Sequence, residues 1–102
     1  INIRGIKFAP YELEEKLLAE LPVSDVCLSV LEDHEGVAKV WVVLVLNEPD
    51  CMTYIQENIV ALLPPVFGAV KLTTMGAIPR TATGKIQRAD LNKKLQALQQ
   101  RR

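Results

Sequence analysis

Seven consecutive apolar residues, Val40 to Leu46, place the tightest limit on what this chain can fold into. The run is rich in valine and has the length of a strand, far short of the roughly 20 apolar residues that a membrane-spanning helix needs. A strand that is apolar almost throughout has to be covered by other elements, because a solvent-facing side would carry polar residues. We therefore expect a central strand from Val37 to Leu46, covered on at least one face, in a protein without a membrane span.

The segments before this run predict a helix followed by an antiparallel partner strand. Pro10 suits the first turn of a helix, where its missing N–H would have no partner in any case, and Pro22 cannot continue one. Val23 to Leu31 is again rich in β-branched residues, and the polar connection 32–36 predicts a hairpin with the central strand. Between the two prolines, leucines recur at the spacing of one apolar helix face: Leu13, Leu17, Leu18 and Leu21.

The segments after the run predict a crossover helix, a third strand and a last helix. Thr53 and Gln56 have the spacing of a capping box, so we expect a helix to begin there and to end before the double proline that follows. Val66 to Met75 predicts a strand parallel to the central one, because a helical connection joins the two. The last helix is marked by three leucines: Leu91, Leu95 and Leu98. The predicted fold class is α+β, with a small mixed three-stranded sheet and packed helices.

Residues 1–8 predict a separate β-hairpin at the front of this domain. Ile3 and Ile6 flank the dipeptide Arg4-Gly5, and apolar residues around a two-residue turn with glycine are typical of a tight hairpin. The chain opens without an initiator methionine or a signal-peptide pattern, so we expect a piece of a longer protein.

Histidine and cysteine usage excludes several kinds of active site. His34 is the only histidine and falls in the predicted hairpin turn, so neither a zinc site nor a Ser-His-Asp triad is expected. Cys27 and Cys51 lack the spacing of metal ligands, and we interpret them as reduced thiols of a cytoplasmic protein. The sequence therefore predicts no metal ligand in this domain.

Charge is distributed unevenly along a chain whose net charge is zero. Residues 1–70 carry four basic and eleven acidic side chains, whereas residues 71–102 carry eight basic side chains and one acid, Asp90. This asymmetry predicts that the last third works beside something anionic. A non-catalytic module that binds nucleic acid is a competing interpretation. The aromatic content of 5% and the lack of a recognition-helix pattern argue against it.

The loop from Pro79 to Arg88 is the best candidate for chemistry, because it carries three cations, two threonines and one glycine, and no acid. Gly84 permits either a positive φ or a close approach of the backbone to a ligand. Lys85 then presents a compact charge that suits phosphate or carboxylate oxygens. The loop is not a Walker A motif, since Ile86 stands where serine or threonine would bind magnesium. On composition alone, a basic surface loop is an equally good interpretation.

Two segments resemble a known family. Pro79 to Arg88, read as Pro-Arg-Thr-Ala-Thr-Gly-Lys-Ile-Gln-Arg, is similar to the last signature of the adenylate-forming (AMP-binding) superfamily of acyl- and aryl-CoA synthetases, luciferases and peptide-synthetase adenylation domains. Ile3 to Glu14 resembles the signature that begins the C-terminal domain of that family. The motifs stand in the family's order, about 75 residues apart, and span the chain from end to end.

The resemblance implies that residues 1–102 are the single mobile C-terminal domain of an ATP-dependent acid–thiol ligase. Such enzymes join a carboxylate to the α-phosphate of ATP, release pyrophosphate, and then pass the acyl group to the thiol of CoA or of phosphopantetheine. By motif position Lys85, on the loop 76–88, is the catalytic lysine of the first step, after which the domain rotates to assist the second. The partner N-terminal adenylation domain would hold ATP with Mg²⁺ and the carboxylic acid, so the isolated chain is expected to be inactive.

The motifs also imply which residues contact the cofactors. Gly5 would line the pantetheine tunnel in the second step, and Arg4 and Lys7 flank that turn, where they would meet phosphates or the N-terminal domain. Thr83 and Gly84 would stand beside the nucleotide with the catalytic lysine. These five residues are the predicted cofactor-binding set.

Departures from the family's patterns narrow the branch. Asn2 replaces the lysine of luciferases and coumarate ligases, Ala9 replaces a glutamate common in peptide synthetases, and Tyr11 stands at a position that is usually small. Ala9 and the run Thr-Ala-Thr-Gly-Lys, which looks more like acyl- or aryl-CoA ligases, favour a CoA ligase, with an adenylation domain that loads a carrier protein as the alternative. The context of Lys85 also resembles the sites of lysine acetyltransferases, which predicts that acetylation removes its charge and stops adenylation. The identity of the acid, the oligomeric state and the hinge before the hairpin are not encoded in these residues.

Overall fold

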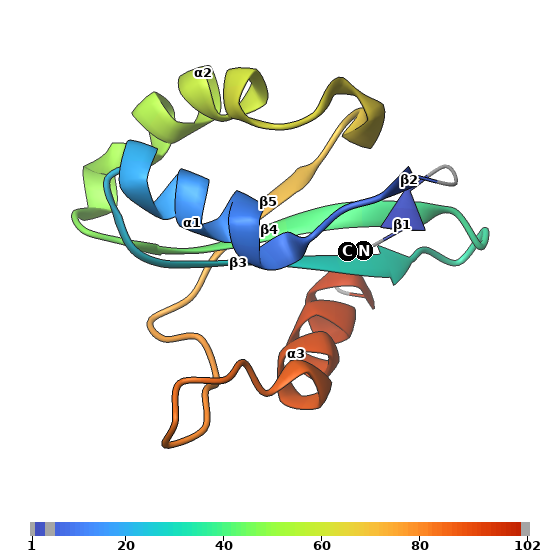
Figure 1. Cartoon of the computed structure of the whole chain (residues 1–102). Coiled ribbons are helices and arrows are strands. Elements are labelled where there is room, and N and C mark those ends of the chain that lie inside the picture. Colours follow the sequence, from blue (N-terminus) through green and yellow to red (C-terminus); the bar gives the residue numbers. More distant parts are fainter. Residues whose placement is uncertain (1, 4–5, 101–102) are drawn as a thin grey trace.

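A three-stranded sheet with helices on both faces forms the body of the protein (Figure 1). The computed structural model describes residues 2–3 and 6–100. Strands β3 (Val23–Glu32) and β4 (Ala38–Leu46) are antiparallel, and β5 (Lys71–Thr74) lies parallel to β4 on its other side. The predicted α+β fold with a small mixed sheet is confirmed, and so is the parallel third strand.

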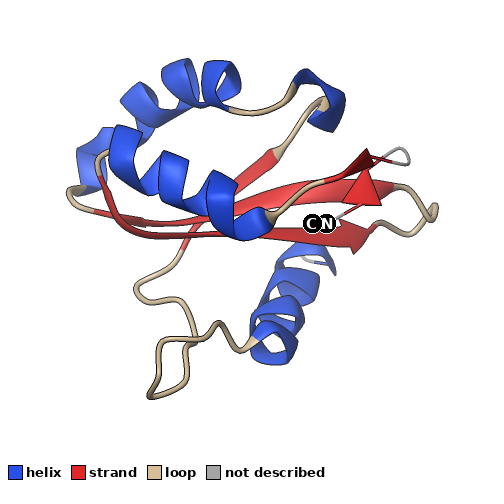
Figure 2. Cartoon of the chain, in the orientation of Figure 1, coloured by secondary structure: helices blue, strands red, loops and turns tan. Residues whose placement is uncertain are grey.

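Helices α1 (Pro10–Glu20) and α2 (Met52–Leu62) cover one face of the sheet, and α3 (Arg88–Gln100) covers the other (Figure 2). Side chains alternate between the two faces along each strand, so the sheet contributes to two cores. The α1–α2 core includes Leu17, Val26, Leu28, Val42, Ile55 and Ile59. The α3 core includes Cys27, Trp41, Val43, Leu91 and Leu95. The apolar run of β4 is therefore buried on both faces.

Two predicted boundaries are wrong, and a short turn explains each. Pro49–Cys51 forms a 3-10 turn that leads directly into α2, so the helix begins before Thr53 and no side chain caps it. This turn already sets the backbone in helical geometry, which removes the need for a capping box. Pro65–Phe67 forms a second 3-10 turn, which replaces the first part of the predicted strand Val66 to Met75 and leaves only β5.

The N-terminal hairpin consists of β1 (Asn2–Ile3) and β2 (Ile6–Lys7), which pair antiparallel around a two-residue connection. This pairing confirms the predicted hairpin and its register. Its two turn residues, Arg4 and Gly5, lie outside the described residues, so their predicted contacts with the thiol substrate stay predictions.

No helix in the described part of the chain has the length and apolar character needed to cross a membrane. Both cysteines are free. Burial, followed by the nearby charge of Glu14, raises the pKa of the Cys27 thiol to about 12. Because the thiolate is the reactive form, Cys27 acts as a core residue and not as a nucleophile.

Candidate functional site

The segment between β5 and α3 folds into a small hairpin around Lys85. Arg80 and Ile86 pair as an isolated antiparallel bridge. Inside it, the Thr81 N–H donates to the Lys85 carbonyl at 2.7 Å, and the Gly84 N–H donates to the Thr81 carbonyl at 2.9 Å. This is the pattern of a β-turn whose last residue, Gly84, takes a positive φ and begins a bulge that Lys85 completes. The predicted loop is thus a defined turn that presents Lys85 from one position.

Gly84 has a φ of +94°, in the left-handed region that glycine tolerates best. A Cβ added at Gly84 would meet nothing within 4 Å of it in the described structure. Of the two roles that the sequence left open for this glycine, the positive φ is therefore the one that the turn itself requires.

Alanine at position 84 should act through backbone strain. We expect Gly84→Ala to lower the free energy of unfolding by about 1–2 kcal/mol, the usual cost of placing an L-residue in the left-handed region. Chemical unfolding of the 102-residue chain measures the loss. Gly76→Ala is the matched control, because Gly76 has the same open space for a Cβ and no positive φ. An equal loss in both variants would contradict the assignment.

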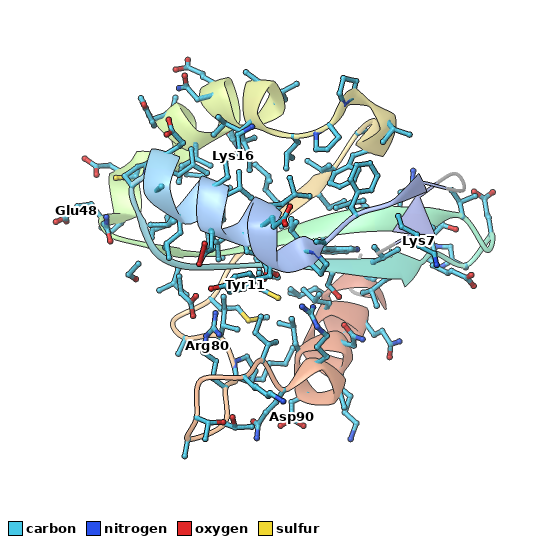
Figure 3. All side chains as sticks on the ribbon, viewed as in Figure 1. Lys7, Tyr11, Lys16, Glu48, Arg80 and Asp90 are labelled. Carbon is cyan, nitrogen blue, oxygen red and sulfur yellow. The ribbon has the colours of Figure 1, made fainter. Side chains whose placement is uncertain are left out.

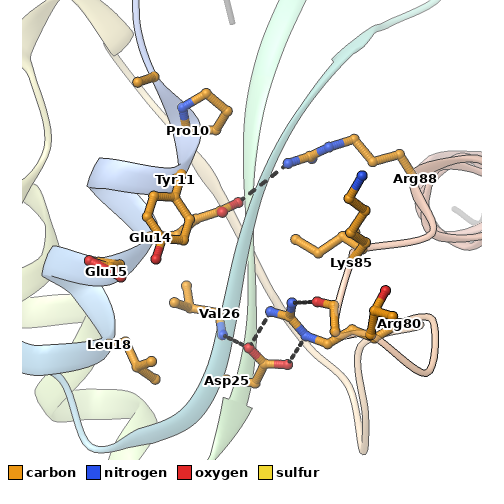
Figure 4. A pocket seen from close by; sticks show the side chains of 14 residues that line it. Pro10, Tyr11, Glu14, Glu15, Leu18, Asp25, Val26, Arg80, Lys85 and Arg88 are labelled. Atoms are coloured by element: carbon orange, nitrogen blue, oxygen red, sulfur yellow. Dashed lines mark hydrogen bonds and ion pairs between the residues drawn. The ribbon is translucent and has the colours of Figure 1, made fainter.

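Arg80, the first cation of the motif, is tied to the sheet (Figure 4). Its Nε and Nη2 donate to the two carboxylate oxygens of Asp25 on β3, at 2.9 and 2.7 Å, and its Nη1 donates to the Gly84 carbonyl at 2.6 Å. The hydrogen bonds from Arg80 hold the pKa of Asp25 below its ordinary value. Asp25 therefore stays ionised at neutral pH, and this contact is lost only when the pH falls below the ordinary range of an aspartate.

Arg88, the last cation of the motif, closes the outer edge of β3. Its Nη1 donates to the Leu28 carbonyl at 2.9 Å, and its Nη2 lies 3.7 Å from Oε2 of Glu14. That buried carboxylate, on α1, accepts the Leu28 N–H at 2.8 Å. Both backbone groups of Leu28 thus have partners at a sheet edge that no other strand of the described chain covers. Arg88 is therefore a structural residue that joins α1, β3 and α3.

Lys85 is the remaining cation of the motif, and its side chain is exposed. Within the part of the chain that the structure describes, its ammonium has neither an ion pair nor a hydrogen bond. The Lys85 side chain borders a cleft of about 590 Å³ between the loop and α1. Figure 4 shows this side chain between those of Arg80 and Arg88. Lys85 is thus available to a partner outside the described residues.

The other predicted contact residues fall into two places. Thr83 lies on the turn itself, where its hydroxyl is 3.0 Å from that of Thr81, which in turn accepts the Lys85 N–H at 3.1 Å. Lys7 lies exposed at the end of β2, and Figure 3 shows it well away from Arg80 and the loop. Lys7 is therefore separated from the loop that carries Lys85.

Sequence reasoning missed the acids that organise the loop. Asp25 and Glu14 are distant from the motif in sequence, and the one available signal was the excess of acids before the basic last third. Tyr11, whose role could not be predicted from the sequence, borders the cleft and is 68% exposed. A hydrogen bond with Glu15 raises the pKa of Tyr11 above its ordinary value, so its hydroxyl stays protonated at neutral pH.

Comparison with known proteins finds its matches among solved structures. No family model matches the sequence, and no curated protein matches it. A fatty acyl CoA synthetase from Mycobacterium tuberculosis is 25% identical, with a TM-score of 0.76, and the match covers 96% of this chain. The o-succinylbenzoate CoA synthetase from Bacillus subtilis, solved with its acyl-adenylate intermediate, is also 25% identical, with a TM-score of 0.68 over 85% of this chain. MatB from Rhodopseudomonas palustris, at 17% identity and a TM-score of 0.78 over 98% of this chain, shows the shared fold.

These structures are much longer than the matched region. The chain spans about a fifth of their length, because the matches cover 20%, 18% and 20% of the three proteins in the order given. Such a share is what one domain of a multidomain enzyme would take. The fold and both sequence motifs agree with the C-terminal domain of the adenylate-forming superfamily, and the matched CoA synthetase structures support that assignment of the chain.

Proposed function

We propose that this domain supplies the catalytic lysine of an ATP-dependent acid–CoA ligase, and that this lysine is Lys85. One observation carries the proposal. The motif holds three cations, of which Arg80 and Arg88 are bound to acids and carbonyls of this domain, whereas the Lys85 ammonium has no partner among the described residues. The backbone of Lys85 is held in place, and its ammonium is unpaired among the described residues. Such a charge is suited to a reaction centre on a neighbouring domain.

The chemistry of the first half-reaction gives Lys85 its role. A carboxylate oxygen of the acid attacks the α-phosphorus of ATP, the bond to pyrophosphate breaks, and an acyl-adenylate forms. Negative charge moves from the carboxylate to the phosphoryl oxygens and the leaving group, and an ammonium beside them stabilises that shift. Thr83 and Gly84 contribute the turn that holds Lys85. We propose that the N-terminal domain binds ATP with Mg²⁺ and the acid.

The second half-reaction would use the other side of the domain. The sulfur of the thiol attacks the acyl carbonyl, and AMP leaves with the electron pair of the broken bond. We propose that Gly5 lines the path of the pantetheine arm and that Arg4 and Lys7 contact the phosphates beyond it. We propose that the whole domain rotates between the two steps, which would bring first the Lys85 loop and then the hairpin to one active site. CoA is the proposed acceptor, and a carrier protein is the second candidate.

Pyrophosphate release by the full-length enzyme tests this function across a panel of aliphatic, aromatic and amino acids. We expect one class of acid to release pyrophosphate from ATP, and added CoA to yield a thioester and AMP. The isolated chain should release none, because it lacks the acid pocket. Failure of every acid in the panel would reject the ligase. A thioester formed on a phosphopantetheinylated carrier protein but not on CoA would select the second candidate.

A further inference from the structure

Arg80 and Asp25 form a strut between β3 and the loop that carries Lys85. The guanidinium uses three nitrogens at once, with Nε and Nη2 on the Asp25 carboxylate and Nη1 on the Gly84 carbonyl. Because the guanidinium is planar and rigid, bonds on two of its sides fix a direction as well as a distance. Figure 4 shows the strut as a bridge from the strand to the turn.

The strand end of the strut is itself fixed. Oδ1 of Asp25 accepts the N–H of Val26 at 2.9 Å in addition to its bond with Arg80. The pairing of β3 with β4 also shifts its register between Val23 and Asp25. Such an irregularity turns a side chain away from the plain alternation of a strand. Asp25 is therefore held in place at the sheet and aimed at the loop.

The loop end of the strut lies next to Lys85, the proposed catalytic residue. The Gly84 carbonyl that Arg80 binds belongs to the peptide bond that leads into Lys85. The N–H and the carbonyl of Lys85 are both bonded to Thr81, at 3.1 and 2.7 Å. The backbone around Lys85 is thus held from three directions, and the remaining freedom lies in its side chain.

The strut contributes more to orientation than to stability. The side chains of Arg80 and Asp25 are 34% and 26% exposed. An ion pair this close to solvent typically contributes about 0–1 kcal/mol to folding, even with good geometry. The consequence of breaking it should therefore appear in the placement of the turn and not in the unfolding of the domain.

We propose that Arg80 and Asp25 are positioning residues for acyl-adenylate formation, because they set the place and direction from which Lys85 reaches the reaction centre. The inference rests on the proposed function of Lys85. It assigns a role to Asp25, which lies outside both sequence motifs and does not touch the reacting atoms.

Asp25→Asn in the full-length enzyme tests the strut. We expect kcat for pyrophosphate release to fall about ten- to a hundredfold, the size expected for a catalytic group displaced by an ångström or less, with little change in KM for ATP. Thioester formation from a supplied acyl-adenylate and the melting temperature should stay unchanged. Amide hydrogen exchange of segment 81–86 should become faster, which reports the freed turn without any assay of activity.

Companion variants separate positioning from general damage. Arg80→Gln should reproduce the loss, and the double variant should be no worse than either single one, since both remove the same contact. Arg80→Lys should be intermediate, because an ammonium can reach one oxygen of Asp25 but cannot form the fork. Asp33→Asn is the matched control. The Asp33 carboxylate accepts two backbone N–H groups in the distant β3–β4 turn, so its loss should not affect adenylation.

The outcomes separate the positioning role of Asp25 from the proposed function of Lys85. If Asp25→Asn keeps full adenylation while Lys85→Ala loses it, the positioning role of Arg80 and Asp25 is wrong and the proposed function of Lys85 stands. If both half-reactions fall together with the melting temperature, Asp25 is only structural and the positioning role is also wrong. If Lys85→Ala keeps full adenylation, the proposed function itself fails, whatever Asp25→Asn does.

Discussion

Lys85→Ala should slow acyl-adenylate formation by about 10²–10³-fold in the full-length enzyme, equivalent to about 3–4 kcal/mol of transition-state stabilisation. The reason is the loss of a positive charge placed where negative charge shifts from carboxylate to phosphate. Thioester formation from a supplied acyl-adenylate should keep its rate, because the proposed rotation of the domain would turn the Lys85 loop away from the reaction. Pyrophosphate release without thiol measures the first step, and thioester yield from the adenylate measures the second.

Matched variants give the Lys85 experiment its controls. Lys94→Ala removes another exposed lysine, on α3 and outside the turn, and should leave both steps unchanged. Lys85→Gln removes the charge but keeps most of the side chain, as acetylation would, and should be nearly as slow as Lys85→Ala. Equal slowing of both half-reactions in Lys85→Ala would contradict a lysine that serves adenylation alone.

The sheet could be predicted from the sequence because its signals are local. The apolar run of β4 predicts a strand covered on at least one face, and the structure packs it between helices on both faces. The hairpin of β3 with β4 and the parallel crossover to β5 follow from chain connectivity. The position of Lys85 on a glycine-containing turn was also visible, since Gly84 and its neighbours are contiguous in sequence.

The surroundings of Lys85 could not be predicted, because they depend on contacts between distant segments. Arg80 donates a hydrogen bond to Asp25, 55 positions away in sequence, and Arg88 donates one to Leu28, 60 positions away. Spacing rules describe neighbours on one helix or strand and contain no information on such pairs. The start of α2 was misplaced for a different, local reason, because a 3-10 turn precedes the helix where a capping box was expected.

These pairs change the meaning of the charge asymmetry. An acidic first part and a basic last part suggested an anionic partner outside the chain. Arg80 and Arg88 instead meet acids of β3 and α1, so part of the basic charge is neutralised within the domain. The charge that indicates function is therefore a smaller part of the chain than the whole basic last third. It is Lys85, the one motif cation whose charge has no partner among the described residues.

Glu14→Ala should give the largest loss of stability among the residues around the cleft. Glu14 is buried and accepts the N–H of Leu28, which is fully buried. Removing the acceptor leaves that donor unpaired, and weakens the hold on Arg88 as well. We expect the free energy of unfolding to fall by about 2–3 kcal/mol, which corresponds to a drop of about 10–20 °C in the melting temperature of a domain of this size.

Two neighbouring substitutions show whether the hydrogen bond to Leu28 is the cause. Glu15→Ala makes the same change one position later, on an exposed side chain, and should alter the free energy of unfolding by about 0.5 kcal/mol or less. Glu14→Gln keeps an oxygen that can accept the Leu28 N–H but loses the charge opposite Arg88, so it should be intermediate. Because α1, β3 and the start of α3 meet at this carboxylate, a Glu14→Ala chain as stable as Glu15→Ala would mean that the edge of β3 is held by packing and not by this contact.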